Sequence, residues 1–124
     1  MTSPLILIYN IDPEKTSKLG AVCARQGIEL RAVKPFEYMR PIGALAGIPV
    51  AESPAFAPGG AFSDEMLVMC HMLSYQLDAF LAGMREAGLP RVALKAVLTP
   101  ANVTWSSLKL RDELAREHQA LAGR

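Results

Sequence analysis

Two short apolar runs, residues 5–9 and 66–70, most strongly constrain how this chain of 124 residues can fold. Neither run contains a charged residue, so each predicts a strand buried on both faces, as in the centre of a sheet covered by helices. Each run is followed by a helical pattern and then by a second strand pattern, at residues 28–33 and 92–98. This alternation predicts an α/β fold.

The strand pattern at residues 28–33 alternates apolar and charged side chains, which favours an edge position. With the two apolar runs in the centre, the expected strand order is 2-1-3-4 in a four-stranded, mainly parallel sheet. Helices on both faces would complete a three-layer α/β arrangement. Residues 1–124 are expected to form a single α/β domain without internal repeats.

Helix boundaries are predicted from capping residues, because side-chain oxygens satisfy free backbone N–H groups and glycine ends helices in the left-handed conformation. The expected terminal residues are Asp12 and Gly27 for the first helix, Ser74 and Gly88 for the second, and Thr104 or Ser106 before the last. The inward face of the last helix is predicted to carry Leu110, Leu114 and Leu121.

Residues 49–65 contain prolines, adjacent glycines and few charges, so they predict a long loop that is more mobile than its surroundings. A dispensable insertion and a lid over a site are both compatible with that composition. The preceding apolar region, residues 36–45, is one candidate surface for a homodimer, and a free strand edge is another.

The composition disfavours nucleic acid and membranes as partners. A net charge of +1 gives no basic surface for nucleic acid and no polybasic membrane signal, and no apolar run is long enough to span a membrane. Cys23 and Cys70 are expected to be buried free thiols in a reducing cytoplasm. Only His71 and His118 are available as imidazole ligands, so neither a metal nor another cofactor is expected.

Polar residues follow several of the predicted strands. If strands 1, 3 and 4 were parallel, their carboxyl ends would share one edge, and a crevice would open where the chain reverses direction. We therefore expect Asn10, His71 and Thr99 to lie in one small pocket with Asn102 at its rim. The full set of candidate ligand-binding residues is Asn10, Asp12, His71, Ser74, Lys95, Thr99 and Asn102.

Three of these positions have two interpretations. Lys95 is either an edge-strand lysine that deters pairing, or a partly buried amine paired with a carboxylate such as Asp12. His71 is either structural or a site residue that enters the crevice, and Cys70 should point to the opposite face. The Thr99–Pro100 bond marks a sharp exit from the strand, and its isomer is not determined by the sequence.

The sequence Leu-Lys-Ala-Val-Leu-Thr-Pro at residues 94–100, followed by Asn102 and Trp105, resembles a bacterial family of unknown function. The resemblance is clearest from residue 66 to residue 118. It implies a small cytoplasmic bacterial protein, and it supplies no reaction, ligand or catalytic residue.

The sequence favours a small binding or regulatory module with a small-molecule pocket at the carboxyl ends of strands 1, 3 and 4. No set of nucleophile, base and acid stands at a spacing that demands catalysis. The alternatives are a small enzyme that uses Lys95, Cys70 or His71, and a structural domain that binds a protein partner or forms a homodimer.

Overall fold

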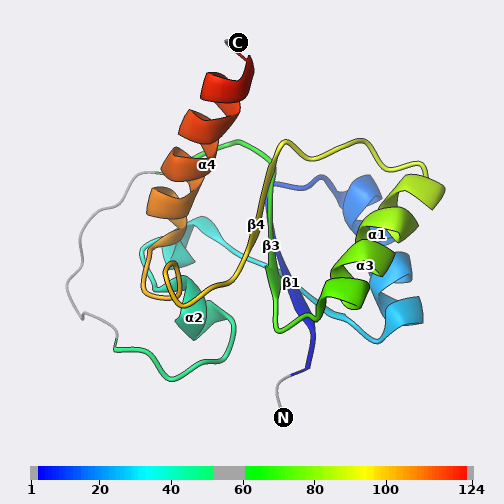
Figure 1. Ribbon diagram of the computed structural model, residues 1–124, viewed down its shortest axis with the longest axis horizontal. Helices are drawn as coiled ribbons and strands as arrows, with labels where there is room; N and C mark the ends of the chain where they lie inside the picture. The colour runs from blue at the N-terminus through cyan, green and yellow to red at the C-terminus, as the bar shows by residue number, and fades with distance from the viewer. Residues whose placement is uncertain (1–2, 52–60, 123–124) are drawn as a thin grey trace.

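The computed structural model describes residues 3–51 and 61–122. Figure 1 shows a central sheet with helices beside it. The elements, in chain order, are β1 (Leu5–Tyr9), α1 (Pro13–Gln26), β2 (Glu29–Ala32), the 3₁₀ helix η1 (Pro35–Glu37), α2 (Ile42–Leu45), β3 (Met66–Cys70), α3 (Ser74–Glu86), β4 (Leu94–Val97) and α4 (Ser107–Ala122).

The sheet has four strands in the predicted order, β2-β1-β3-β4. β1 pairs with β2, and β3 with β4, in parallel. The central pair, β1 with β3, is antiparallel, so the sheet is mixed, and the expected parallel arrangement of strands 1, 3 and 4 is wrong. An apolar run indicates burial on both faces but not direction, and the long connection from β2 to β3 can return the chain to either end of the sheet.

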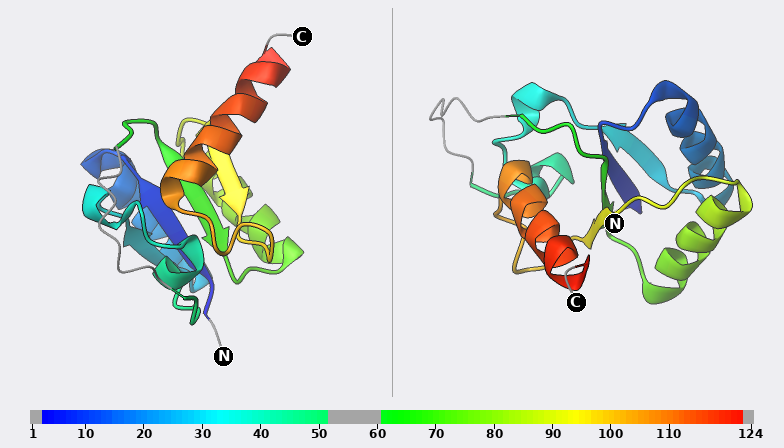
Figure 2. Two further views of the ribbon diagram at one scale, coloured as in Figure 1. Left: turned by 90° about the vertical axis from the view of Figure 1, so that its left-hand side faces the viewer. Right: turned by 90° about the horizontal axis from the view of Figure 1, so that it is seen from above.

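Side chains that alternate along β1 and β3 divide the buried residues into two clusters on opposite faces of the sheet. Tyr9 and Val68 belong to the cluster that includes residues of α2 and α4, and Ile6 and Met69 to the one beneath α1 and α3. Figure 2 shows the same division, with α2 and α4 on one side of the sheet and α1 and α3 on the other.

The order of the elements is approximately repeated, although the sequence has no internal repeat. A strand, a helix and a parallel strand occur in residues 5–32 and again in residues 66–97, and a helix follows each time, with four residues in α2 and sixteen in α4. The central ladder is symmetric about the pair of Leu7 and Val68, because Leu5 pairs with Cys70 and Tyr9 with Met66. The strand pairing of the sheet is therefore approximately two-fold symmetric about its middle.

Backbone conformation supports the same correspondence. Asn10 and His71 follow the two central strands, and each has a φ of 59°. Gly27 and Gly88 follow α1 and α3, also at positive φ. Few other residues are shared between the halves, apart from Pro35 and Pro100 after the outer strands. The correspondence therefore lies in the backbone and not in side-chain identity.

Most of the predicted helix boundaries are correct. The Asp12 carboxylate accepts a hydrogen bond from the Lys15 N–H at 2.9 Å, and Gly27 ends α1 in the left-handed conformation. Ser106, rather than Thr104, caps α4, since its Oγ accepts from the Lys109 N–H.

Two expectations about helices are wrong. Ser74 is the first residue of α3 rather than its cap; the Gln76 side chain instead accepts a bond from the Leu73 N–H at 2.7 Å. Leu121 is 67% exposed. Figure 1 shows that the end of α4 extends past the sheet, which agrees with this exposure.

The sequence predicts a mobile loop at residues 49–65. Residues 52–60 of this segment lie outside the described chain. Residues 49–51 and 61–65 form neither helix nor strand. Among the helices that are described, none combines the length and apolarity needed to cross a lipid bilayer.

Candidate functional site

The expected pocket formed by Asn10, His71 and Thr99 does not exist as a unit. Because β1 and β3 are antiparallel, their carboxyl ends lie at opposite ends of the sheet, and Asn10 is separated from His71. The carboxyl ends that do share an edge are those of β3 with β4 and of β1 with β2. A hollow is present at each of these two edges.

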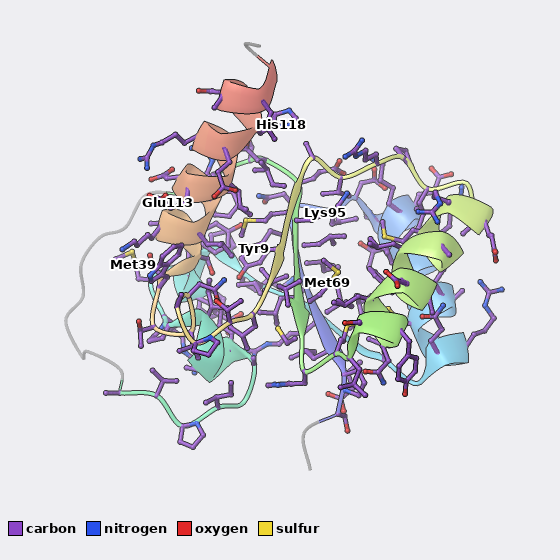
Figure 3. All side chains as sticks on the ribbon, in the orientation of Figure 1. Tyr9, Met39, Met69, Lys95, Glu113 and His118 are labelled. Atoms are coloured by element: carbon purple, nitrogen blue, oxygen red, sulfur yellow. The ribbon has the colours of Figure 1, made fainter. Side chains whose placement is uncertain are left out.

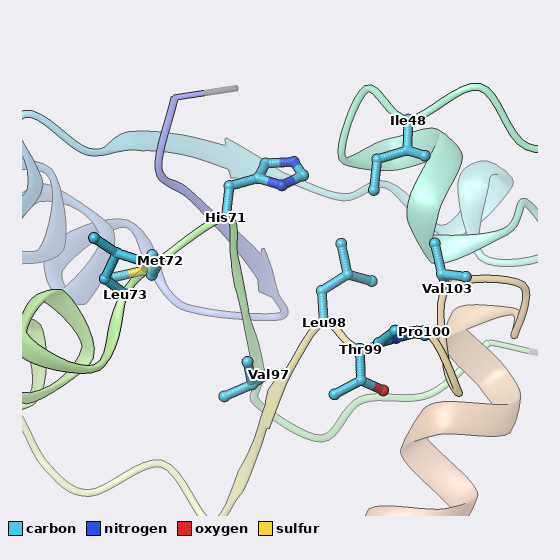
Figure 4. A pocket seen from close by; sticks show the side chains of 9 residues that line it. All are labelled: Ile48, His71, Met72, Leu73, Val97, Leu98, Thr99, Pro100 and Val103. Atoms are coloured by element: carbon cyan, nitrogen blue, oxygen red, sulfur yellow. The ribbon is translucent and has the colours of Figure 1, made fainter. Parts of the chain in front are cut away.

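The larger hollow, at the carboxyl ends of β3 and β4, has a volume of about 500 Å³, and we call it the β3–β4 hollow. Figure 4 shows its lining side chains around a common space. His71 and Thr99 supply the polar groups. The other lining residues are apolar: Ile48, Met72, Leu73, Val97, Leu98, Pro100 and Val103.

His71 is held in place by the backbone of the α2 region. Its Nε2 lies 2.9 Å from the carbonyl oxygen of Ala46. Because a carbonyl oxygen can only accept, Nε2 must carry the proton, and in the neutral ring Nδ1 is then an acceptor. No hydrogen bond joins Nδ1 to any residue of the described chain. His71 thus combines a structural bond with one nitrogen that remains available to a ligand.

Thr99 and Asn102 form a reciprocal turn. The Asn102 Oδ1 accepts from the Thr99 N–H at 2.9 Å, and the Thr99 Oγ1 accepts from the Asn102 N–H at 3.3 Å. The Asn102 Nδ2 also donates to the Val97 carbonyl. Asn102 is buried beside the hollow and does not line it, so its placement fits a structural role. The Thr99–Pro100 bond is trans.

This turn docks the second half of the chain on the first. The Trp105 carbonyl accepts from the Ile42 N–H, and the Val103 carbonyl from the Gly43 N–H, each at 2.8 Å. In return, the Tyr38 carbonyl accepts from the Ser107 N–H at 3.0 Å. The motif on which the family resemblance rests therefore contains residues that hold α2 and α4 together.

The smaller hollow, at the carboxyl ends of β1 and β2, has a volume of about 230 Å³. We call it the β1–β2 hollow. It occupies the position that the repeat makes equivalent to the β3–β4 hollow. The equivalent lining pairs are Asn10 and His71, Ile11 and Met72, Ala32 and Val97, Val33 and Leu98, Lys34 and Thr99, and Pro35 and Pro100.

Asn10 uses its side chain to hold the segment that precedes β3. Its Nδ2 donates to the carbonyls of Phe62 and Asp64 at 2.8 and 2.9 Å, and its Oδ1 accepts from the Tyr38 hydroxyl at 3.3 Å. The Tyr38 and Phe62 rings stack with centroids 4.6 Å apart. These bonds engage both polar atoms of the amide and account for Asn10 without a ligand.

Three further candidates lie apart from the β3–β4 hollow. Asp12 caps α1, and Ser74 is exposed in the first turn of α3. Lys95 lies on edge strand β4 and lines a different hollow, between α3 and β4. It forms no ion pair with Asp12 or with any other carboxylate in the part of the chain that is described.

Cys70 lies in a different environment from that of a reactive thiol. It is fully buried within the cluster that contains Tyr9 and Val68, and burial raises its pKa to about 12. At neutral pH the thiolate is therefore scarce. The nearby Tyr9 hydroxyl is also buried, with a raised pKa, and lies 2.6 Å from the Ser107 Oγ. Within residues 3–51 and 61–122, no group of His, Cys, Asp and Glu gathers to hold a metal ion.

Ile48 and Val103 were missed as site residues by sequence reasoning. Each belongs to an irregular connection, and each reaches the hollow only because the Thr99–Asn102 turn packs against the α2 region. No periodicity marks such positions, since their placement depends on contacts between the two halves.

Comparison with known proteins matches one half of the repeat. Residues 65–121 match the model of a protein family described as a domain of unknown function (DUF3783). The matched segment runs from the residue before β3 almost to the end of α4. No curated protein and no solved structure matches the chain.

Proposed function

We propose that this chain is a small binding or regulatory module whose ligand occupies the β3–β4 hollow. The carrying observation is the volume of about 500 Å³, which falls within the usual range of ligand pockets, whereas the equivalent β1–β2 hollow is smaller. The lining favours a mostly apolar molecule that donates one hydrogen bond to Nδ1 of His71. We also propose that all residues form one domain, because both halves contribute to one sheet.

Binding is favoured over catalysis because the three candidate catalytic residues are separated. Cys70 is buried in the core, Lys95 lines another hollow, and His71 already donates to Ala46. The two buried free thiols support a reducing cytoplasm as the location, and the resemblance to a bacterial family supports a bacterial origin.

A homodimer through the edge of β4 is the weaker alternative. The Leu98 N–H bonds to the Met69 carbonyl, so the backbone groups of Val97 point to the outer edge. The Val97 carbonyl already accepts a hydrogen bond from the Asn102 side chain, and Lys95 places a charge on the same strand, so both features disfavour pairing with another strand. Phe36 and Met39 remain exposed, so the surface at residues 36–45 is the better place to look for a partner.

The binding proposal is tested by filling each hollow at an equivalent position. Val97→Phe should fill the β3–β4 hollow, while Ala32→Phe changes the matched site in the first half. Titration with the neutral fluorophore N-phenyl-1-naphthylamine, followed by amide chemical shifts, should locate binding near Met72 and Leu98. We expect Val97→Phe to weaken binding at least tenfold and Ala32→Phe to leave it unchanged. If both substitutions weaken binding equally, or if neither weakens it, the ligand does not occupy this hollow.

His71→Gln provides a separate test of the acceptor nitrogen. The glutamine amide extends as far as Nε2 and can donate to Ala46, but it places no acceptor where Nδ1 stands. The melting temperature should therefore change little. Indole, which donates one N–H, should bind more weakly to this variant, whereas 1-methylindole, which cannot donate, should bind both proteins equally.

A further inference from the structure

A second sizeable hollow lies between the C-terminal half of α3 and the beginning of β4, with a volume of about 460 Å³. We call it the cationic hollow. Figure 3 shows Lys95 on the side of the sheet that faces α3. The lining residues that matter here are three apolar side chains and three cations: Leu81, Met84, Leu89, Arg85, Arg91 and Lys95. No acidic residue of the described chain lines it.

Within the described chain, the three cations have no ionic partners. Some other cations are paired, as Lys15 is with Glu65 at 2.9 Å and Arg111 with Asp64 at 3.0 Å, while Lys18 and Lys34 on the surface are not paired with any described residue. In residues 3–51 and 61–122, no carboxylate lies within ion-pair distance of Arg85, Arg91 or Lys95. Partial burial lowers the pKa of Lys95, and repulsion by Arg91 lowers it further. An anion placed between these groups would relieve that repulsion.

The fold itself does not require these charges. In the equivalent half, the ladder places Leu30 where Lys95 stands. Ala24 occupies the helical position equivalent to Arg85. An edge lysine can deter strand pairing, and an arginine in the last turn of a helix interacts favourably with its dipole. Those effects explain each residue alone, but not the meeting of three cations at one apolar cavity.

We propose that the cationic hollow binds an amphipathic oxyanion, an alkyl chain that ends in a carboxylate or a phosphate. The oxyanion lies among Lys95, Arg85 and Arg91, and the chain packs against Leu81, Met84 and Leu89. Charge-assisted hydrogen bonds supply the polar contribution, and apolar burial supplies the remainder. This ligand and site are distinct from those proposed at the β3–β4 hollow.

The test uses isothermal titration of the whole chain with octanoate, octyl phosphate, 1-octanol and inorganic phosphate. We expect one of the two octyl anions to bind at least tenfold more tightly than both 1-octanol and inorganic phosphate. Whichever anion binds more tightly identifies the head group. If neither octyl anion binds more tightly than 1-octanol, charge has no role and the proposal is overturned. If the tighter of the two octyl anions binds no better than inorganic phosphate, the hollow binds ions only nonspecifically and the proposal is likewise overturned.

Matched variants place the ligand. Lys95→Met keeps the length of the side chain, and Arg91→Gln changes an exposed residue, so both should fold. Each should weaken binding of the octyl anion about tenfold, as loss of one charged hydrogen bond predicts. Lys18→Met, which removes an exposed charge from α1, should leave binding unchanged. Val97→Phe should also leave it unchanged, because it fills the other hollow. If Lys95→Met and Arg91→Gln bind like the parent, the anion is elsewhere and the proposal is wrong.

Discussion

The two halves of the chain share a backbone plan but use their polar groups differently. In the first half, the turn after β2 is stabilised by Glu37, which accepts from the Lys34 N–H at 3.2 Å and forms an ion pair with Arg31. In the second half, Asn102 performs the same backbone function without charge. Asn10 engages both of its polar atoms, whereas His71 keeps one nitrogen unbonded among the described residues.

This difference separates what the fold needs from what a site would need. Features found in both halves, such as the left-handed residue after the central strand, serve the architecture. Features that differ in the second half, namely the larger volume of the β3–β4 hollow and the three cations of the cationic hollow, are the better candidates for function. The first two predictions below compare equivalent positions of the two halves, and the last two compare two residues of one type.

The largest expected effect concerns the two central strands. Ile6 and Leu67 occupy equivalent positions and are both fully buried. We expect Ile6→Ala and Leu67→Ala each to lower the free energy of unfolding by about 2–5 kcal/mol, because each removes core contacts and leaves a cavity. Chemical denaturation measures both. A strongly unequal pair of values would show that the halves do not contribute comparably to the core.

The next effect should distinguish Asn10 from His71. Asn10→Ala removes three side-chain hydrogen bonds and strains the left-handed backbone, so we expect a loss of about 2–3 kcal/mol. His71→Ala removes one bond at the same backbone conformation, and about 1–2 kcal/mol is expected. The glycine variants measure the side-chain contribution alone. Equal losses for the two alanine variants would remove the distinction drawn between these residues.

The contact between the halves at Gly43 should be sensitive to a single methyl group. A Cβ there would lie 2.9 Å from the Val103 carbonyl oxygen and still closer to the Val103 side chain. We expect Gly43→Ala to destabilise by about 1–3 kcal/mol through overpacking. Gly20→Ala in α1, where no atom lies within 4 Å of the added Cβ, should instead stabilise by up to about 1 kcal/mol. Tolerance of Gly43→Ala would mean that the turn and α2 can separate easily.

The smallest effect is the pH dependence from the buried thiols, one in each half. Burial raises the pKa of Cys23 to about 11 and that of Cys70 to about 12, from the ordinary value of 9.0. The resulting stabilisation is complete below pH 9 and is lost as the pH rises through the folded-state values. Between pH 8 and pH 10, we expect a loss of about 1 kcal/mol per thiol. Cys23→Ala and Cys70→Ala should each reduce this loss, and unchanged pH dependence in both would contradict it.

The sequence was sufficient to predict the four strands, their order and most helix boundaries, since burial periodicity and capping are local. It did not determine strand direction, because the apolar runs in β1 and β3 would be buried equally in either orientation. That one error displaced Asn10 from His71 and divided the expected pocket into two. His71 and Thr99 were correctly placed together, because β3 and β4 belong to one parallel unit.

Presence of both halves in one chain has a consequence for how each can change. In an assembly of two identical subunits, every substitution appears in both subunits. A substitution that improves a site in one subunit must therefore also be tolerated at the same position in the other. Here the partner strand of β3 is encoded separately and remains at a high local concentration through the covalent connection. The second half is thus free to acquire an enlarged cavity or a cluster of repelling charges while the first half keeps the sheet intact.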